Sequence, residues 1–422
     1  MPQALRRRVG AVSLPKLNES SLSIQVAGAN PGSRDVKAHH HSRRGLRGSR
    51  VLAAAAAAVT LSAVATGCGS APAQGGDSEA AKARSAADLG GMDKLVEAAK
   101  KEGELNVYAL APTWANYGEM IKAFEKKYGI EVHNEDPGGS SQGALNAAAK
   151  RKGQDRAVDA LDLGTSFMRA AKSKKLLTPY KVKGWADIPD SQKQPDASYM
   201  NNYGGYISIG CDAKAVKECP KTFEDLLKPQ YKNKVALNGN PNESSSAFSA
   251  IIAAALANGG GFDDVQPGLD FFKKLKKAGN YVPVESTKAT IQKGETPISI
   301  DWDYLNLGYG AELKSKGVDW KVNVPQDGQY SQYYNQGVNK YAPHPAAARL
   351  WLEFLYSPEG QNIWLRGFSR PALLEEMEKD GTADEKAAAK LPEVDGTPKF
   401  PSAEQEAKAQ KTISQGWGAA VS

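Results

Sequence analysis

Short apolar segments alternate with amphipathic ones along most of this chain, and this alternation strongly restricts the folds open to it. The apolar segments expected to be strands are Leu105–Ala109, Ile130–His133, Ala160–Leu163, Tyr206–Ile209, Lys234–Leu237 and Pro297–Ile300. Helices are expected between them, for example at Met92–Lys101 and Gln142–Lys150. Such alternation with short connections predicts parallel sheets covered by helices. Because it restarts beyond Tyr203, we expect two α/β lobes.

The charge of the chain is concentrated in its first 67 residues. The whole chain has a formal net charge of +7 at pH 7. Residues 1–67 contain ten Lys and Arg and two acidic residues, a net charge of +8. Residues 68–422 then contain 44 basic and 45 acidic residues, a net charge of −1. This part lacks the basic footprint of a nucleic-acid-binding protein, so we expect no nucleic-acid partner.

The basic excess belongs to a leader segment. Four arginines between positions 43 and 50 precede the uncharged run Val51–Ala65, which is rich in Ala, Val and Leu. This run is shorter than the roughly 20 residues of a spanning helix. A basic region, a short apolar run and small residues are typical of a secretory signal. We expect residues 1–67 to be this leader, with residues 1–35 an over-extended start and His39–His41 an incidental part of it.

The leader ends in Ala65-Thr66-Gly67-Cys68, which resembles the lipobox of bacterial lipoproteins. In that family the Cys becomes the first residue of the mature protein and carries lipid. Ala65 departs from the Leu that is usual at its position. The resemblance implies a lipid anchor at Cys68, with an unmodified Cys as the alternative. Residues 68–87 are rich in Gly, Ser, Ala and Gln and are expected to form a flexible tether.

Cys211 and Cys219 remain as an even pair beyond the leader. An exported chain folds in an oxidising compartment, where such pairs are commonly bonded. We therefore predict a disulfide between them. The alternative is two reduced, buried thiols.

Polar and aromatic residues follow the predicted strands at the points where open α/β sheets bind their ligands. These clusters are Pro112–Trp114, Gly138–Ser141, Thr165–Ser166, Asn240–Ser244 and Asp301–Tyr304. Ordinary turns do not need this composition, so the clusters predict a binding cleft.

Four longer segments carry a resemblance to a known family. They are ELNVYALAPTWANYGEMIKAFEKKYGIEV, DALDLGTSFMRAAKSKKLLTPY, GETPISIDWDYLN and NKYAPHPAAARLWLEFLYSPEGQNIW, of which the last is the most specific. They resemble the bacterial extracellular solute-binding proteins of ABC importers, in the branch with polyamine, iron(III) and aminoethylphosphonate binders. The resemblance runs from Glu104 to Arg370, which is most of the chain beyond the leader.

The resemblance implies a two-lobed, type II periplasmic-binding-protein fold with the ligand held between two α/β lobes. Two crossing segments are expected near Asn201–Cys211 and Val322–Asn335. Lobe one then comprises residues 88–204 and 322–345, and lobe two comprises residues 205–321 and 346–422. The function implied is that of a monomer without a cofactor, which binds a small solute outside the cytoplasm and delivers it to the permease subunits of an importer.

The candidate ligand-binding residues of lobe one are Trp114, Ser140, Ser141, Thr165 and Ser166. An indole at a strand end can stack on a ligand or cover a cation, although Trp114 can equally pack at the hinge. Hydroxyls and helix-start amides suit an oxyanion. Helix capping alone also explains these serines.

The candidates of lobe two are Asn242, Glu243, Ser244, Asp301, Trp302 and Asp303. Glu243 can neutralise an amine or favour the helix dipole. If the strand unwinds at the cleft after Ile300, both aspartates and Trp302 converge there. The matching position in polyamine binders is an aromatic floor with carboxylates nearby, and the alternative is a buried Trp with capping aspartates.

These residues give the leading ligand hypothesis, a polyamine-like cation held between Trp114 and the Asp301–Asp303 turn. It carries the expectation that Trp302→Ala and Asp303→Asn weaken amine binding about tenfold and leave the melting temperature of the empty protein nearly unchanged. An oxyanion or phosphonate is the alternative ligand. A further alternative ligand is an iron(III) complex, because the tyrosine pair Tyr333-Tyr334 is present. We prefer Tyr334 as an aromatic wall that stacks on the ligand, and we expect no resident metal ion.

An enzyme is not expected. Only His133 and His344 lie beyond the leader, and His-Glu-x-x-His and Cys-x-x-Cys motifs are absent from the sequence. Asp301 and Asp303 can in principle act as the acid and base of an extracellular hydrolase, but no further partner group accompanies them. A purely structural surface lipoprotein would not need polar and aromatic clusters at its strand ends, so this class of protein is not expected either.

Overall fold

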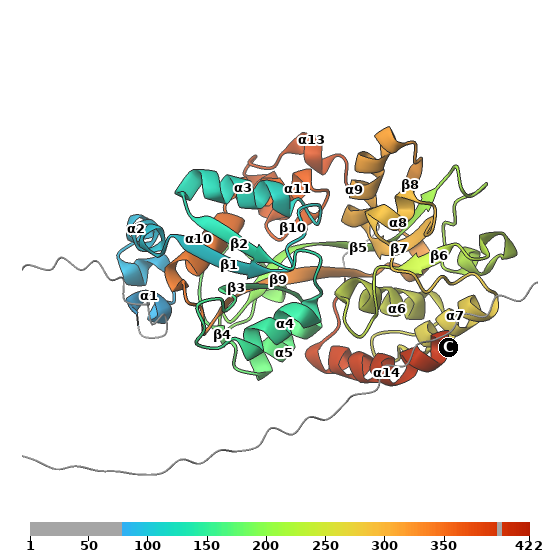
Figure 1. The fold of residues 1–422 in the computed structure, drawn as a ribbon, viewed down its shortest axis with the longest axis horizontal. Helices are drawn as coiled ribbons and strands as arrows, with labels where there is room; N and C mark the ends of the chain where they lie inside the picture. The colour runs from blue at the N-terminus through green and yellow to red at the C-terminus, as the bar shows by residue number, and fades with distance from the viewer. Residues whose placement is uncertain (1–77, 395–398) are drawn as a thin grey trace, which may run out of the picture. The chain divides into compact units, whose positions relative to one another are not determined.

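The computed structural model describes residues 78–394 and 399–422 (Figure 1). The chain divides into two units, Met1–Gly69 and Ser70–Ser422, and the described residues all belong to the second. The predicted leader and the predicted lipidation site Cys68 lie outside the described residues. Within the described ranges, no helix is both long enough and apolar enough to cross a membrane.

Two long strands run between two lobes and belong to both (Figure 1). In β5 (Met200–Asp212), the residues from Met200 to Tyr206 pair with β9 (Ser331–Asn339), and those from Ile207 to Asp212 pair with lobe two. The eight-stranded sheet that contains them has the main order β3-β9-β5-β7-β6. The described unit therefore has the predicted two-lobed α/β architecture.

Lobe one holds the first strands and helices and also a later group. The first group is α1 (Glu79–Lys82), α2 (Met92–Glu102), β1 (Glu104–Tyr108), α3 (Tyr117–Tyr128), β2 (Glu131–Glu135), α4 (Ser141–Lys150), β3 (Ala160–Gly164), α5 (Thr165–Ser173) and β4 (Leu177–Thr178). The later group is α10 (Pro345–Leu355), α11 (Pro358–Arg366), β10 (Arg370–Pro371), α12 (Leu374–Lys379) and α13 (Glu385–Ala388). β1 and β2 form a separate parallel pair.

Lobe two is built from the middle of the chain and its last helix. Its elements are β6 (Val235–Leu237), α6 (Ser245–Ala257), α7 (Gln266–Lys277), α8 (Lys288–Gln292), β7 (Ile298–Trp302), α9 (Asp303–Leu313), β8 (Trp320–Asn323) and α14 (Ala403–Val421). Short 3-10 helices lie at Ala86–Leu89, Asp190–Gln192, Glu224–Leu227, Pro229–Tyr231, Lys314–Lys316 and Gln326–Gly328. A large cluster of buried apolar residues extends through both lobes, and a smaller one lies between α4, α5 and β3.

Local sequence explains most element boundaries. The stripe of Tyr117, Met120 and Phe124 is buried along α3, and Gly129 ends this helix in the left-handed conformation. Ser140 caps α4 by accepting a hydrogen bond from the Gly143 amide. β7 departs from the prediction, because it continues two residues beyond Ile300 and pairs with β5 as far as Trp302.

Two predicted boundaries need correction. α10 packs on α1, α2 and α3, and α11 packs on α3, β10 and α13, so residues 346–388 belong to lobe one rather than to lobe two. The chain reaches α14 on α6 and α7 only after this group, so its return to lobe two comes later than the predicted boundary after residue 345. The end of the predicted tether is ordered, because the buried Arg349 guanidinium donates to the Ala81 and Ala83 carbonyls.

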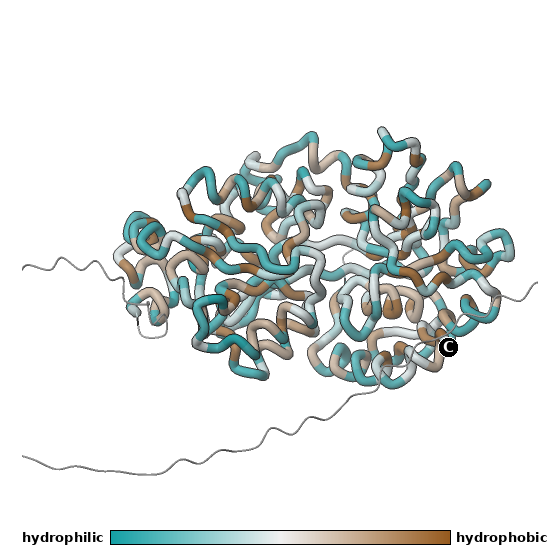
Figure 2. Tube along the Cα trace, in the orientation of Figure 1, coloured by the Kyte–Doolittle hydropathy of each residue, from teal (hydrophilic) through white to brown (hydrophobic). Residues whose placement is uncertain are grey.

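The crossing strands are polar although they are buried. Every residue of β9 is buried, including Gln332, Asn335, Gln336 and Asn339, and the tube of Figure 2 is pale to teal where the chain crosses between the lobes. Side-chain partners offset this burial: Gln336 donates to the Tyr117 hydroxyl at 3.0 Å and Asn339 to the Val158 carbonyl at 2.6 Å. The two crossing strands that form the hinge are therefore buried without a continuous run of apolar residues.

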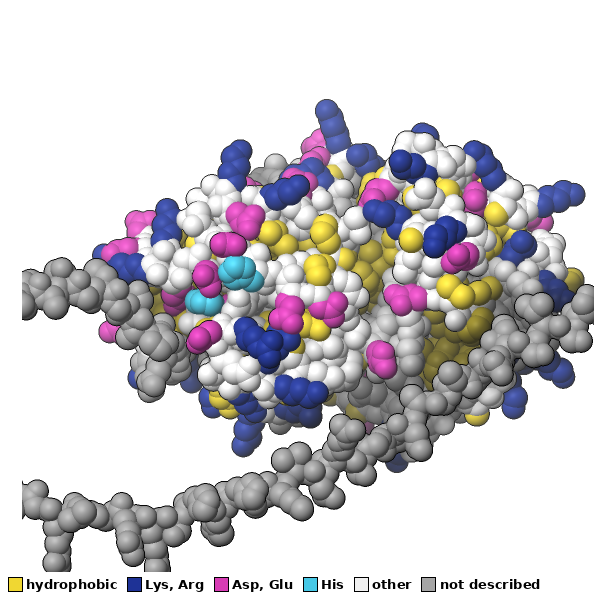
Figure 3. All heavy atoms as spheres, viewed as in Figure 1, with side chains coloured by type: hydrophobic (Ala, Val, Ile, Leu, Met, Phe, Trp, Pro, Cys, Tyr) yellow, Lys and Arg dark blue, Asp and Glu magenta, His cyan; other side chains and the backbone are white. Residues whose placement is uncertain are grey.

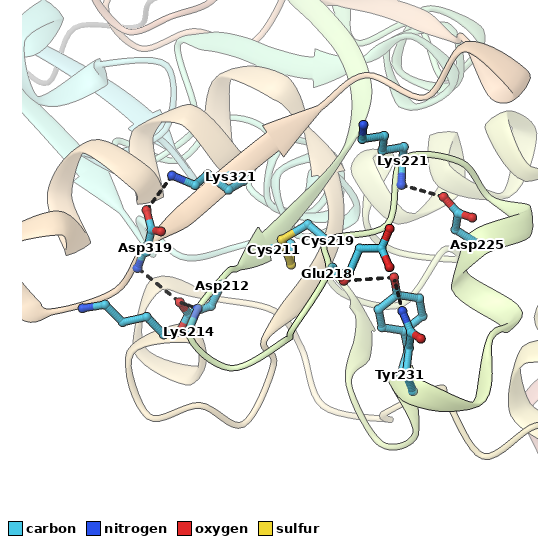
Figure 4. The surroundings of a disulfide bond; sticks show 11 residues. Cys211, Asp212, Lys214, Glu218, Cys219, Lys221, Asp225, Tyr231, Asp319 and Lys321 are labelled. Carbon is cyan, nitrogen blue, oxygen red and sulfur yellow. Dashed lines mark hydrogen bonds and ion pairs between the residues drawn. A yellow bond between two sulfur atoms is a disulfide. The ribbon is translucent and has the colours of Figure 1, made fainter.

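The predicted disulfide between Cys211 and Cys219 is present, with the two Cα atoms 5.8 Å apart (Figure 4). It ties the end of β5 to the loop that follows. Two further contacts hold this loop, since the Tyr231 hydroxyl donates to the Glu218 carbonyl at 3.0 Å and the Lys221 amide donates to the Asp225 carboxylate at 2.9 Å. The bond thus fixes the lobe-two end of a crossing strand.

Reduction of this bond is expected to lower the free energy of unfolding by about 2–3 kcal/mol, because a short loop in the unfolded chain loses its constraint. Intact-mass measurement after alkylation should detect two additional blocked thiols only when the protein has first been reduced. Urea unfolding of the oxidised and reduced forms measures the energy. Equal alkylation with and without reductant would rule out the bond.

Candidate functional site

A cavity of about 590 Å³ lies between the two lobes. Lobe one contributes the ends of β1, β2 and β3 and the start of α4, and lobe two contributes the ends of β6 and the starts of α6 and α8. In Figure 3, hydrophobic side chains are visible between the two halves of the molecule, bordered by acidic and basic side chains. The cavity therefore lies where the strand-end clusters predicted a binding cleft.

Six of the predicted ligand-binding residues line this cavity. They are Trp114, Ser140, Ser141, Glu243, Ser244 and Tyr334. Glu243 is exposed at the rim, so solvent screens its charge. The serines also cap helices, since Ser140 caps α4 and Ser244 caps α6. Capping and lining are thus compatible roles at these positions.

An aromatic wall covers the hinge side of the cavity. The ring of Trp114 lies 5.5 Å from that of Tyr334 and 6.1 Å from that of Tyr304, both edge-on. Tyr334 stacks in parallel on Tyr203 at 5.6 Å, and the Trp114 indole nitrogen donates to the Tyr203 hydroxyl at 2.8 Å. These contacts fix the rings in place, which preserves their faces for a ligand.

The N-termini of α4 and α6, one from each lobe, meet at Gly164. The Gly164 amide donates to the Ser141 hydroxyl at 3.5 Å. On the other side, a side chain at position 164 would overlap Ser245, so only glycine allows this approach. Helix N-termini present amides and a partial positive charge. This junction is therefore the part of the cavity best suited to an anion.

Asp162 lines the same cavity, and the sequence prediction missed it. It lies on β3 two residues before Gly164, and its Oδ2 accepts hydrogen bonds from the hydroxyls of Tyr117 at 2.7 Å and Tyr203 at 3.0 Å. Burial raises the pKa of Asp162 to about 7, although the two hydroxyls oppose that shift. A single charge inside the apolar strand sequence Ala160–Leu163 was the signal that could have identified it.

Other lining residues were also missed. They are Asn238 after β6, Ser245 at the start of α6, Glu285 to Lys288 before and at the start of α8, and Tyr309 on α9. The segment that contains Glu285 lies beside β6 through hydrogen bonds such as that from the Ser286 amide to the Leu237 carbonyl at 2.8 Å. The short apolar run Tyr281–Val284 directly precedes this segment, and Tyr281 forms a parallel bridge with Val235, so this run was the signal that could have located it.

Asp301 and Trp302 do not line the cavity, which corrects their prediction as ligand-binding residues. Both are fully buried because β7 continues through them instead of ending at Ile300. Asp301 accepts hydrogen bonds from the Ser246 hydroxyl and from the Asn238 amide nitrogen, and burial raises its pKa to about 7. The Trp302 ring stacks on that of Tyr304 at 6.2 Å.

Asp303 is a hinge residue rather than a ligand-binding one. Its buried carboxylate accepts a hydrogen bond from the Tyr206 amide of β5 at 3.0 Å and pairs with Arg370 of lobe one at 2.6 Å. Burial raises the pKa of Asp303, and the Arg370 guanidinium opposes this. The pair therefore joins the start of α9 in lobe two to β10 in lobe one, at the crossing strand.

A second ion pair joins the lobes at the other crossing strand. Glu406 of α14 is 1% exposed, lies 2.6 Å from Arg169 of α5 and accepts a hydrogen bond from Gln332 of β9 at 3.1 Å. Burial raises the pKa of Glu406 to about 7, and Arg169 opposes this. We name Arg370–Asp303 and Arg169–Glu406 the hinge pairs.

Thr165, Ser166 and Asn242 also lie outside the lining of the cavity. The Thr165 hydroxyl donates to the Tyr333 carbonyl at 3.2 Å on the opposite side of β9, Ser166 is buried, and Asn242 is exposed. Tyr333 lines a separate small cavity behind the hinge and Tyr334 lines the cleft, because neighbouring residues of a strand face opposite sides. The two tyrosines therefore cannot bind one metal ion together.

The segment Gly139–Gly143 has the Gly-x-Ser-x-Gly spacing of a nucleophile elbow, with Ser141 in the nucleophile position. Neither His133 nor His344 lines the cavity, and His344 instead pairs with the buried Asp159 at 2.9 Å. Among the described residues, no group of three or more His, Cys, Asp or Glu is arranged to hold a metal ion. Ser141 is thus without a histidine base in the cleft.

Asp303→Asn is expected to lower the free energy of unfolding by about 3 kcal/mol, because the change leaves the largely buried Arg370 guanidinium without its charged partner. This replaces the sequence-based expectation of an unchanged melting temperature. Urea unfolding measures the effect. The control is Asp319→Asn, whose carboxylate pairs with Lys321 at an exposed site and which should cost less than about 1 kcal/mol. Equal stability of the two variants would contradict the role of this hinge pair.

Sequence comparison identifies relatives over most of the folded part. A family model described as bacterial extracellular solute-binding protein matches residues 123–397. A putative 2-aminoethylphosphonate-binding periplasmic protein of Salmonella paratyphi A is 26% identical over 283 residues, which cover 61% of this chain and 80% of that protein.

Solved structures of two-lobed, type II periplasmic binding proteins are similar in fold. The periplasmic binding protein AfuA from Actinobacillus pleuropneumoniae, with fructose-6-phosphate bound, matches with a TM-score of 0.58 and 20% identity over 75% of this chain and 99% of that one. The spermidine/putrescine-binding protein PotD from Streptococcus pneumoniae matches with a TM-score of 0.51 and 15% identity, over 76% of this chain and 99% of that one.

Members of this family are the substrate-binding components of importers and not enzymes, and they work outside the cytoplasm. The cavity between two lobes fits that task, because hinged lobes can close on a solute. On its match to the family model and on its fold, this chain belongs to the bacterial extracellular solute-binding proteins and is the solute-binding component of an ABC transporter.

Proposed function

We propose that the cleft captures a small organic solute through an oxyanion group of the phosphonate kind and delivers it to a membrane permease. The observation that carries this proposal is the junction of α4 and α6 at Gly164, where Ser141 and Ser245 accompany two helix N-termini. An anion bound there receives hydrogen bonds from both lobes, so its binding favours the closed state.

The name of the Salmonella relative supports the same ligand class, since that protein is described as binding a phosphonate. Support for a polyamine is weaker. That hypothesis depended on Asp301 and Asp303, whose carboxylates are buried and bonded within the protein. The hypothesis of an iron(III) complex depended on Tyr333 and Tyr334, whose rings face opposite sides of β9.

Titration calorimetry of the mature protein with aminoalkyl- and alkylphosphonates is expected to show binding. Ser141→Ala and Ser245→Ala should each weaken it about tenfold, because a hydrogen bond to a charged group contributes about 1.5–3 kcal/mol. The control is Ser414→Ala on the exposed side of α14, which should have no effect. Tight binding of putrescine without binding of any phosphonate would overturn the proposed ligand class.

The lipid anchor is the second part of the proposal. It is supported by the Ala65–Cys68 sequence and by the position of Arg349, which holds Ala81 and Ala83 to lobe one. A chain lipidated at Cys68 would then have its tether attached to the first lobe. This arrangement keeps the protein at the membrane close to the permease.

Cys68→Ala is expected to move the protein from the membrane fraction to the medium, because no other membrane attachment is proposed. Fractionation of expressing cells followed by immunoblotting is the measurement. The control is Cys211→Ala with Cys219→Ala, which removes both other cysteines and should leave the protein in the membrane fraction. Membrane retention of the Cys68→Ala variant would contradict lipid anchoring.

A further inference from the structure

The carboxylate of Asp162 is only half satisfied within the protein. Its Oδ2 accepts two hydrogen bonds, from Tyr117 and Tyr203. Its Oδ1 is buried and has no hydrogen-bond partner in the described residues. Leaving a buried carboxylate oxygen unpaired is costly. Since Asp162 lines the cleft, a ligand can supply the missing donor.

The groups around Asp162 do not neutralise its charge. Those that face it are the phenols of Tyr117 on α3, Tyr203 on β5, Tyr304 on α9, Tyr334 on β9 and Tyr356 after α10. Burial and the neighbouring carboxylate raise the pKa of these phenols, so they stay neutral. The described residues thus provide hydrogen bonds to Asp162 but no ion pair with a basic side chain.

The aromatic wall lies beside this carboxylate. Trp114 donates to the Tyr203 hydroxyl, which in turn donates to Asp162, so the indole and the carboxylate belong to one hydrogen-bonded chain. Aromatic faces attract cations, and the attraction is larger where water is excluded. A carboxylate and aromatic rings at one place favour a protonated amine over a neutral donor.

We propose that Asp162 is a specificity-determining residue that accepts a hydrogen bond from an ammonium group of the solute through Oδ1. This inference rests on the proposed function, because it takes the oxyanion end of the same solute to lie at the α4–α6 junction. Asp162 and Gly164 lie on the same face of β3, roughly 7 Å apart. A zwitterion with its ammonium and oxyanion separated by about two carbon atoms fits that distance.

The test compares 2-aminoethylphosphonate with ethylphosphonate, which lacks the amine, by calorimetry at pH 8. The wild-type protein should prefer the aminated ligand at least tenfold. Asp162→Asn should lose this preference and keep its affinity for ethylphosphonate, because Asn still accepts the tyrosine hydrogen bonds but carries no charge. The control is Glu353→Gln, which alters another buried carboxylate that accepts a tyrosine hydroxyl, that of Tyr180 at 2.7 Å, away from the cleft.

A second measurement varies the pH. Because the pKa of Asp162 is raised to about 7, its carboxylate is mostly ionised at pH 8 and mostly protonated at pH 6. The preference of the wild type for the aminated ligand should therefore fall, relative to that of Asp162→Asn, as the pH falls through 7. The variant is the reference because the ammonium group lowers the second pKa of its own phosphonate, so the two ligands titrate differently.

The outcomes separate this inference from the proposed function. Equal wild-type affinities for the two phosphonates at pH 8, a preference that survives in Asp162→Asn, or the same pH dependence of the preference in both proteins would overturn the role of Asp162 and leave the oxyanion site standing. Failure of the wild type to bind either phosphonate would overturn the proposed function itself.

Discussion

The structure depends on two buried strands that are shared by both lobes. β5 and β9 carry Asn, Gln and Tyr side chains through the interior, and the hinge pairs hold the lobes together beside them. Asp303 is bonded to the backbone of β5 and Glu406 to a side chain of β9. Separation of the lobes at either point would leave a charge buried without its partner. Large movements are therefore expected at the mouth of the cleft and small ones at the strands.

The buried carboxylates differ in how completely the protein satisfies them. Asp301 has a hydroxyl, a side-chain amide and a backbone amide as donors, and Asp303 has backbone amides and Arg370. Asp162 alone of these three lines the cleft and retains an oxygen without a donor. Burial raises the pKa of all three, so a raised pKa does not distinguish them. The unmet hydrogen bond, together with access to the cavity, is what points to a ligand.

The cleft divides its proposed tasks between the lobes. The oxyanion junction needs both lobes, because α4 belongs to lobe one and α6 to lobe two, and the two meet where Gly164 contacts Ser245. Asp162 and Trp114 belong to lobe one and are fixed to it by Tyr117 and Tyr203. A solute can thus bind first through its amine to lobe one and then favour closure through its anion. This order couples recognition to closure, because a ligand shifts a protein toward the state that it binds better.

The sequence by itself determined the two-lobed α/β fold, the family, the disulfide and six of the residues that line the cleft. Each of these follows from local information: apolar periodicity, matching segments, cysteine number, or a polar cluster directly after a strand. The tertiary structure alone decided the lobe of α10 and α11, the burial of Asp301, Trp302 and Asp303, and the place of Asp162 in the cleft. Those depend on pairing between distant segments, as when β5 extends β7 by two residues beyond Ile300. Whether a carboxylate meets a basic side chain, a hydroxyl or an open cavity depends on such pairing, which residue order along one segment does not encode.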